Sequence, residues 1–277
     1  MNLRKALDRA KKERAIQSDA DDTIAAKSSP TKDSGWQPPK YSESRNITID
    51  ISTAIRNHCV AFSPDYAEVN YYKVLRTQLR QIGQQKNWNT VMVTSASPNE
   101  GKTVTSINLA ATFAREYNQT VLLVDADLRM QMIHRYLGYS SQLGLLDYLE
   151  DKAAMNDIIT WPGIEKFTII SGDRVVDDSS ELIGSPRMHS LMGELKQRYD
   201  DRFIIFDAPP VLGVADTLAF APLVDCIIIV VGAGVTDRQN LKEAIELLPQ
   251  EKIAGFVLNR FKGPNRLYGK YGYRYGQ

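Results

Sequence analysis

The sequence contains little of the chemistry on which several protein classes depend. It has only two cysteines, Cys59 and Cys226, in 277 residues, which cannot build a disulfide framework and lack C-x-x-C spacing. No apolar run reaches the roughly 18–20 residues that a membrane-spanning helix needs, and the charged N-terminal stretch is unlike a secretory signal. These absences predict a soluble, intracellular protein.

An excess of charge of one sign is also missing. The 34 Lys and Arg side chains nearly balance the 33 Asp and Glu side chains, which argues against a protein that coats nucleic acid. The three histidines, His58, His134 and His189, show no metal-ligand spacing, so we expect them to be structural or surface residues. In contrast, 43% of the residues are apolar, which is enough for one large folded domain.

Composition divides the chain into four regions. Residues 1–17 combine a helical apolar spacing with basic side chains, which is typical of a solvated helix or of a docking element for a partner or an anionic membrane surface. Residues 18–57 are rich in Ser, Asp, Pro, Lys and Thr, which predicts a disordered linker. We expect one folded domain over 58–262 and a flexible, tyrosine-rich tail over 263–277.

The domain region alternates helical patterns with short apolar runs. A helix is predicted over 66–85, because apolar residues return there every three to four positions. The runs that follow are β-rich and continuous, which is typical of strands covered on both faces. They lie at 90–94, 121–124, 167–170, 203–206, 226–231 and 253–258. This alternation predicts an α/β fold with a doubly wound, mostly parallel sheet.

Two helix starts can be read from local signals. Ser185-Pro186 predicts an N-cap followed by the first helical residue, because proline fits the first turn of a helix. Thr236-x-x-Gln239 has the spacing of a capping box. Both predictions place a helix immediately after a turn, as a parallel sheet requires.

One segment carries a clear chemical signal. The sequence T-S-A-S-P-N-E-G-K-T at 94–103 fits a Walker A loop, with alanine in place of the first glycine, and it lies between a predicted strand and a predicted helix. In such a loop successive backbone N–H groups hold phosphates, and Lys102 adds a positive charge. The hydroxyl of Thr103 can bind Mg²⁺. The predicted nucleotide-binding residues of the loop are Ser97, Pro98, Asn99, Glu100, Gly101, Lys102, Thr103 and Val104.

Three carboxylates follow two of the predicted strands. Asp125 and Asp127 come at the end of one strand, and Asp207 comes at the end of another. Ligands of open α/β sheets lie beyond the carboxyl ends of the strands, so we expect all three carboxylates beside the Walker A loop. With Lys102 and Thr103 they can hold Mg²⁺ and leave one carboxylate to orient a nucleophile.

Together these motifs resemble the bacterial tyrosine kinases of the polysaccharide co-polymerase systems, the CapB/CpsD/Wzc cytoplasmic kinase family within the MinD/ParA-like P-loop superfamily. TSASPNEGKT is similar to the family's Walker A, VLLVDADLRMQMIHRYLG to its Walker A′, and FIIFDAPPVLGVADT to its Walker B. The similarity runs from about Pro64 to the C-terminus. It implies an ATP- and Mg²⁺-dependent protein-tyrosine autokinase.

The resemblance also implies a role for individual residues. Lys102 and Thr103 would bind phosphate and Mg²⁺, and Asp127 and Asp207 would organise the metal. Asp125 would be the base or positioning group for the tyrosine hydroxyl. Asn259, in the segment VLNR, matches the adenine-contacting asparagine of the superfamily.

The strongest alternative is a MinD/ParA-like ATPase switch, which gates partner or membrane binding without tyrosine transfer. Such ATPases carry a second lysine five residues before the Walker lysine, whereas this chain has Ser97 there. The next two residues are Pro98 and Asn99 instead of glycines. These departures favour the kinase family. A nucleotide-binding scaffold, with a tail that recruits partners without being modified, is a third alternative.

The tail is the second feature that favours a kinase. Residues 268–277 contain four of the 13 tyrosines, and the glycines between them discourage a helix. We therefore predict phospho-acceptor sites rather than core packing or an aromatic binding strip. The four predicted sites are Tyr268, Tyr271, Tyr273 and Tyr275. Each phosphate would add about −1.5 to −2 charges, so modification of all four would add about −6 to −8, reverse the sign of this basic tail and favour its release.

The resemblance implies partners as well. It predicts control of exopolysaccharide or capsule polymerisation and export, and recruitment to the inner face of the plasma membrane by a chain-length-determinant (co-polymerase) adaptor. Family members that form rings carry E-x-x-R-x-x-R on the helix before the Walker strand. Here the corresponding residues are Asn70, Lys73 and Arg76. Because the acid is missing, although Glu68 is close, a homo-oligomer is allowed but ring assembly through this helix is in question.

Overall fold

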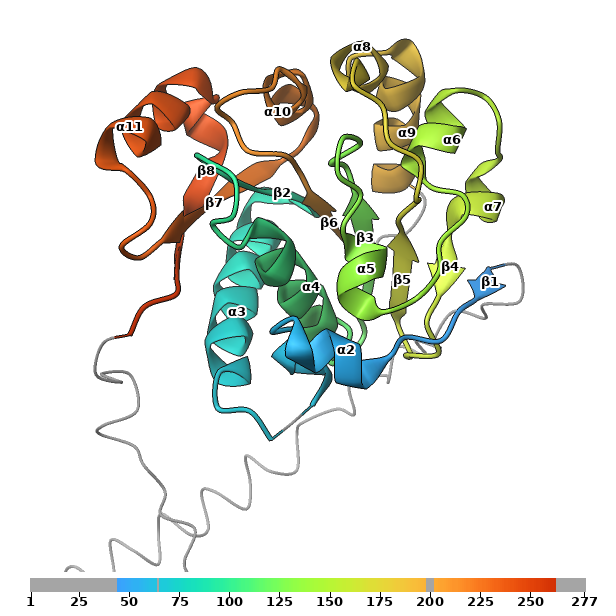
Figure 1. The fold of residues 1–277 in the computed structure, drawn as a ribbon, viewed down its shortest axis with the longest axis horizontal. Helices are drawn as coiled ribbons and strands as arrows, with labels where there is room; N and C mark the ends of the chain where they lie inside the picture. Colours follow the sequence, from blue (N-terminus) through green and yellow to red (C-terminus); the bar gives the residue numbers. More distant parts are fainter. Residues whose placement is uncertain (1–43, 64, 198–201, 263–277) are drawn as a thin grey trace, which may run out of the picture. The chain divides into compact units, whose positions relative to one another are not determined.

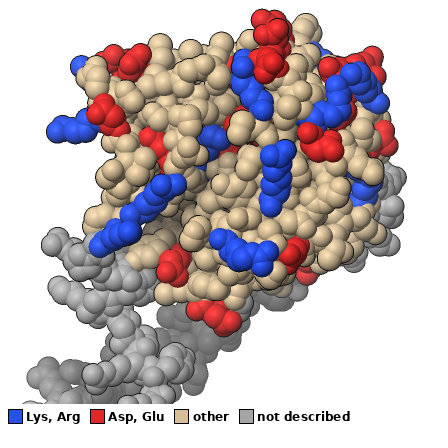
Figure 2. All heavy atoms as spheres, viewed as in Figure 1, with Lys and Arg blue, Asp and Glu red and all other residues tan. Residues whose placement is uncertain are grey.

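The computed structural model describes residues 44–63, 65–197 and 202–262. The predicted N-terminal helix at 1–17, most of the predicted linker and the predicted tail at 263–277 lie outside these ranges. Within them, no helix combines the length and the apolar character that crossing a membrane requires. Figure 2 shows basic and acidic side chains interspersed over one face, in keeping with the near-zero net charge.

The domain is built on one eight-stranded sheet (Figure 1), with strand order β1-β4-β5-β3-β6-β2-β7-β8. The strands are β1 (Arg45–Asn46), β2 (Thr90–Ser95), β3 (Thr120–Asp125), β4 (Thr160–Trp161), β5 (Phe167–Ile170), β6 (Arg202–Asp207), β7 (Cys226–Gly232) and β8 (Ile253–Asn259). Every neighbouring pair is parallel except β4 and β5. The predicted mostly parallel α/β fold is therefore confirmed, and each predicted apolar run falls in a strand.

Helices cover both faces of the sheet (Figure 1). One face packs against α2 (Ile51–Arg56), α3 (Val69–Lys86), α4 (Lys102–Phe113) and α5 (Ile133–Leu137). The other packs against α6 (Leu145–Leu149), α7 (Met155–Ile158), α8 (Ser179–Ile183), α9 (Pro186–Gln197), α10 (Asp216–Phe220) and α11 (Arg238–Leu247). Three short 3₁₀ turns complete the described elements, at η1 (Val60–Phe62), η2 (Ala221–Leu223) and η3 (Gln250–Lys252).

The central strands explain why the apolar runs of the sequence are continuous. Every residue of β2, β3 and β6 is buried, because helices cover both faces of these strands. Phe203 of β6 stacks on Phe113 of α4 with ring centroids 4.2 Å apart, whereas Phe206 meets Phe220 edge-on on the opposite face. This packing holds the carboxyl ends of β2, β3 and β6 at one edge of the sheet.

The predicted linker extends too far toward the C-terminus. It was expected to reach residue 57, but β1 already pairs with β4, and α2 packs beside α5. Asp50 caps α2 by accepting from the backbone amides of Ser52 and Thr53, and Ala54 is fully buried. A two-residue strand and a six-residue helix are too short to stand out from a Ser- and Pro-rich composition, which is why the boundary was missed.

The two predicted helix starts have different outcomes. Helix α9 begins at Pro186, and Ser185 Oγ accepts from a backbone amide of its first turn at 3.2 Å, as predicted. Helix α11 is capped by Asp237 rather than by Thr236. The reason is that the Thr236 hydroxyl is used elsewhere, where it accepts from Gly232 N at 2.7 Å and donates to a Glu100 carboxylate oxygen at 2.6 Å.

Candidate active site

The Walker A segment forms the turn between β2 and α4, which begins at Lys102. Asn99 and Gly101 have positive φ values of 63° and 98°. At position 101 the space available requires glycine as well. A Cβ at position 101 would lie 1.9 Å from Asn259 Nδ2. The glycine thus lets the end of β8 approach the loop while the loop presents the free N–H groups of the first turn of α4.

The loop is held by side chains from two other segments. Asn259 Nδ2 donates to the carbonyl oxygen of Glu100 at 2.9 Å. The Glu100 side chain is fully buried, and one carboxylate oxygen accepts from Ser97 N at 3.2 Å while the other accepts from the Thr236 hydroxyl. Asn259, predicted to contact adenine, here positions the phosphate loop, and Pro98 is exposed at its tip.

Replacing Thr236 by valine should weaken this arrangement. The substitution removes a hydroxyl that serves both Gly232 N and the buried Glu100 carboxylate. We expect the free energy of unfolding to fall by about 1–3 kcal/mol, as measured by urea denaturation. Thr77→Val is the matched control, since the exposed Thr77 hydroxyl only donates to Lys73 O of its own helix. Equal unfolding midpoints for the two variants would contradict the expectation.

The structure brings the predicted lysine and the three aspartates together. Lys102 Nζ lies 2.9 Å from Asp127 Oδ2, and Asp125 lies opposite Asp207 in the register of β3 and β6. Thr103 is buried and its side chain hydrogen-bonds to Asp207. All three carboxylates act electrostatically on Lys102. These residues are distant in sequence and meet because their strands end at the same edge of the sheet.

The aspartates differ in their hydrogen bonds. Asp125 Oδ2 accepts from Ile133 N at 3.0 Å and from Ser171 Oγ at 3.2 Å, whereas Asp207 Oδ1 accepts from Ser106 Oγ at 3.1 Å. Each of the three carboxylates keeps one buried oxygen that has no hydrogen-bond partner among the described residues: Asp125 Oδ1, Asp127 Oδ1 and Asp207 Oδ2. Buried polar atoms rarely lack partners, so these oxygens point to a ligand.

The donor set fits Mg²⁺. Carboxylate and hydroxyl oxygens are the ligands that this cation prefers, and the free oxygens of Asp127 and Asp207 lie in the same cluster as Thr103. Over the described ranges, no group of three or more His, Cys, Asp or Glu side chains is arranged to hold a metal ion by itself. Mg²⁺ is commonly bound by one or two carboxylates together with water and substrate phosphates. A site in which the protein supplies only part of the ligands therefore suits this cation.

The pKa shifts of the clustered residues indicate that the site holds more negative than positive charge. Burial, followed by the charges of Asp207 and Asp127, raises the pKa of Asp125 to about 8. Burial also raises the pKa of Asp207. For Lys102, burial lowers the pKa, but the nearby Asp207 and Asp127 charges outweigh it and the pKa is raised. One permanent cation therefore faces three acids, and a bound divalent cation would relieve their repulsion.

Three residues of this region were not predicted: Ser106, Ser171 and Thr236. Ser106 lies one helical turn after Lys102, and Ser171 directly follows β5, at the same sheet edge as the aspartates. The strand-end rule that found the aspartates could have found Ser171 as well. Thr236 carries no comparable signal, because its partner Glu100 is 136 positions away.

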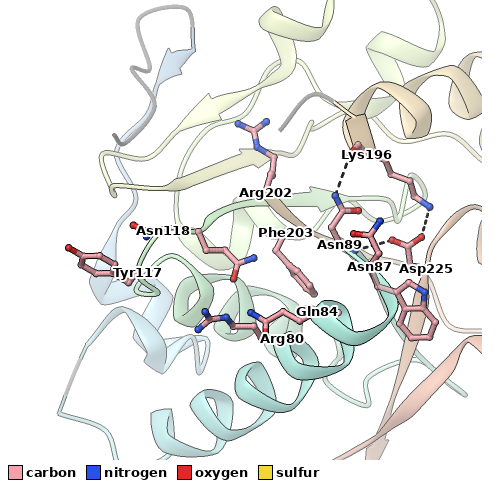
Figure 3. Close-up of a pocket in the computed structure, with 13 residues that line it drawn as sticks. Arg80, Gln84, Asn87, Asn89, Tyr117, Asn118, Lys196, Arg202, Phe203 and Asp225 are labelled. Atoms are coloured by element: carbon pink, nitrogen blue, oxygen red, sulfur yellow. Dashed lines mark hydrogen bonds and ion pairs between the residues drawn. The ribbon is translucent and has the colours of Figure 1, made fainter. Parts of the chain in front are cut away.

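A separate cavity of about 660 Å³ lies near the amino ends of the strands (Figure 3). Asn89, Phe203 and Asp225 line it, and each lies at or next to the start of a strand. Asp225 is already bound by Lys196 Nζ at 2.6 Å and by Asn89 N at 3.0 Å. This cavity therefore lies at the amino ends of the strands, whereas the Walker A loop lies at their carboxyl ends, and it is not part of the nucleotide site.

The predicted phospho-acceptors Tyr268, Tyr271, Tyr273 and Tyr275 lie outside the described residues.

Comparison with known proteins identifies the family. The model of the CobQ/CobB/MinD/ParA nucleotide binding domain matches residues 91–270, more than half of the chain. Tyrosine-protein kinase YwqD of Bacillus subtilis (strain 168) is 30% identical over 220 residues, which cover 78% of this chain and 92% of YwqD. Putative tyrosine-protein kinase EpsB of Ralstonia nicotianae is 30% identical over 240 residues, 84% of this chain. The chain spans 31% of the length of that longer relative.

Solved structures agree with this result. The kinase domain of the Escherichia coli tyrosine kinase ETK superposes with a TM-score of 0.68 at 27% identity, over 82% of this chain and 93% of that domain. The family resemblance of the motifs is thereby confirmed. The chain belongs to the CobQ/CobB/MinD/ParA nucleotide-binding family and, within it, to the bacterial tyrosine-protein kinases.

Proposed function

We propose that this bacterial tyrosine kinase uses ATP and Mg²⁺ to phosphorylate its own C-terminal tyrosines, Tyr268, Tyr271, Tyr273 and Tyr275. The observation that carries the proposal is the meeting of Lys102 with Asp125, Asp127 and Asp207 beside the Walker A loop. The similarity to YwqD over nearly its whole length supports tyrosine as the acceptor. Transfer would occur between copies of the chain.

The residues of the cluster have distinct proposed roles. Lys102 and the N–H groups of the loop hold the phosphates, and Thr103, Asp127 and Asp207 hold Mg²⁺. When bound, Mg²⁺ supplies positive charge that offsets the charge on the phosphates. Asp125 accepts the proton of the tyrosine hydroxyl as the phenolic oxygen bonds to the terminal phosphorus and ADP leaves. Burial and the neighbouring acids raise the pKa of Asp125 in the metal-free site, and the charge of a bound Mg²⁺ would favour the carboxylate form that can accept this proton.

The rival proposal, a MinD/ParA-like ATPase without tyrosine transfer, has less support. The position of its second lysine is Ser97, whose Oγ accepts from Asn240 Nδ2 at 3.4 Å and whose backbone amide is bound by Glu100. Relatives at 30% identity are named tyrosine-protein kinases. Both the loop and the comparisons therefore favour phosphoryl transfer to tyrosine.

Phosphate mapping tests the proposal. Purified protein is incubated with Mg-ATP and analysed by mass spectrometry, alongside a variant truncated before Leu267. We expect phosphotyrosine within 268–275 in the full chain and its loss in the truncated chain, which retains every described residue of the site. ATP hydrolysis without phosphotyrosine would instead support the ATPase, and nucleotide binding with neither would support a scaffold.

We propose that the biological role is control of exopolysaccharide or capsular polysaccharide polymerisation and export. A membrane chain-length-determinant adaptor would recruit the cytoplasmic chain to the inner face of the plasma membrane. The motif resemblance supports both proposals, and residues 1–17 offer a basic docking segment. Co-sedimentation with vesicles that contain or lack the adaptor tests recruitment, and equal binding to both would contradict an adaptor.

A further inference from the structure

Strand β8 forms one edge of the sheet and pairs with β7 on one side only. Its seven residues, Ile253–Asn259, include no charged side chain. Phe256 and Leu258 are 54% and 56% exposed. Natural edge strands are usually short or protected by charged residues or proline, because open N–H and C=O groups attract another strand. Strand β8 has neither a charge nor a proline, and its one irregularity is a shift of its register against β7 between Ile227 and Ile228.

An apolar groove of about 390 Å³ runs between β8 and α3. Leu75, Leu79 and Ile82 line it from α3, and Ala254 and Val257 line it from β8. None of its lining residues is charged, although 24% of the chain is. We call β8 together with this groove the β8 strip. Three glutamines, Gln78, Gln81 and Gln85, also line the groove, and an exposed, mostly apolar and uncharged surface of this kind marks an interaction site.

The basic side of α3 is already in use within the domain. Arg76 forms an ion pair with Glu116 and donates to Thr112 O at 2.9 Å. Arg80 lies 2.7 Å from the same glutamate. These contacts fasten α3 to the end of α4. Neither arginine lines the β8 strip.

We propose that the β8 strip is an interface between two copies of this chain, in which the two β8 strands pair antiparallel about a twofold axis. In a twofold interface the same surface patch of both copies meets itself. A strongly charged patch would therefore repel its counterpart, so the patch must carry little net charge. The uncharged strip meets this condition. Each open strand edge supplies the hydrogen-bond partners that the other lacks, and the exposed ring of Phe256 lies beside a groove that can receive its counterpart.

Other segments of the chain match the strip less well. Residues 1–17 carry six Lys and Arg side chains against two acids, and residues 263–277 carry three basic side chains and no acid. The strip offers no acidic side chain to pair with either segment. A second copy brings an equally uncharged apolar edge. The proposal concerns assembly and does not depend on the proposed kinase reaction.

The mass in solution tests the proposal, without nucleotide and over a range of concentrations. We expect light scattering to give twice the 31.1 kDa chain mass. Phe256→Glu should weaken dimerisation at least about 100-fold, because it buries an unpaired charge in the interface. Val175→Glu is the matched control, since Val175 is 55% exposed and lies outside the strip. Its mass should equal that of the wild type.

Cross-linking gives a second measurement. Cys59 and Cys226 are buried, so a cysteine introduced on β8 reacts without interference from them. At least one of Ala254→Cys, Phe256→Cys and Leu258→Cys should form a covalent dimer on oxidation, whereas Val175→Cys should not. A monomeric wild type, a dimer that Phe256→Glu leaves intact, or cross-linking in the control alone would overturn the proposal.

Discussion

Lys102→Met is expected to lower the rate of tyrosine autophosphorylation by about 10²–10³-fold or more, the typical effect of removing one group that stabilises charge in the transition state. Lys102 is the cation that the described part of the chain places within the cluster of Asp125, Asp127 and Asp207. Without it, the terminal phosphates would face the carboxylates with only the backbone N–H groups and any bound metal to offset their charge. Methionine keeps an unbranched side chain, one atom shorter, and removes its charge.

Two comparisons make this result specific. Lys102→Arg keeps the charge but spreads it over a planar group that does not reproduce the point contact of an ammonium, so its rate should lie between those of Lys102→Met and the wild type. Lys242→Met, on the exposed side of α11, should leave the rate unchanged. The readout is the initial rate of phosphotyrosine formation at saturating Mg-ATP. A rate for Lys102→Met within threefold of the wild type would contradict a role for Lys102 on the phosphates.

Asp125→Asn is expected to stabilise the nucleotide-free protein at pH 8 while it impairs phosphorylation. The pKa of Asp125 is raised to about 8 in the folded state, compared with about 3.9 for an unfolded aspartate. Below the lower value both states are protonated and the residue has no net effect. As the pH rises toward 8 the unfolded state has lost its proton while the folded state still holds one, so the wild type loses stability.

Asparagine removes this penalty and can keep both native hydrogen bonds. Its oxygen can accept from Ile133 N and Ser171 Oγ, which share one oxygen of Asp125. We expect a gain of about 1–3 kcal/mol at pH 8, comparable to the cost of leaving a buried polar group unsatisfied, and no gain near pH 4. Urea denaturation at both pH values measures it, with exposed Asp177→Asn as the control. A variant less stable than the wild type at pH 8 would show that Asp125 stabilises the folded site.

Most of the sheet could be predicted because its signals are local. Six continuous apolar runs predicted the six longest strands, and the strand-end rule placed Asp125, Asp127 and Asp207 at one edge with Lys102. Strand β1 and helix α2 were missed, because their burial depends on contacts with β4 and α5 that no local pattern encodes.

The fine geometry of the site could not be predicted for a similar reason. Asp125 and Asp127 are one residue apart, yet Asp127 pairs with Lys102 while Asp125 accepts from Ile133 N and Ser171 Oγ. The chain leaves the strand at Asp125, so alternation no longer fixes side-chain directions. The link between Glu100 and Thr236 joins segments far apart in the chain and appears only once the sheet is assembled.

The close contact of Asn259 with Gly101 and Glu100 couples the phosphate loop to the end of β8. The tyrosine-bearing segment begins four residues after Asn259 in the sequence. The start of this segment and the phosphate loop therefore stay close together as long as Asn259 remains bonded to Glu100 O. Inserting residues after Lys262 would let the proposed acceptor tyrosines reach further without changing the contact between Asn259 and the loop. Altering Asn259 would weaken that contact without changing the reach, so the two properties can be varied independently.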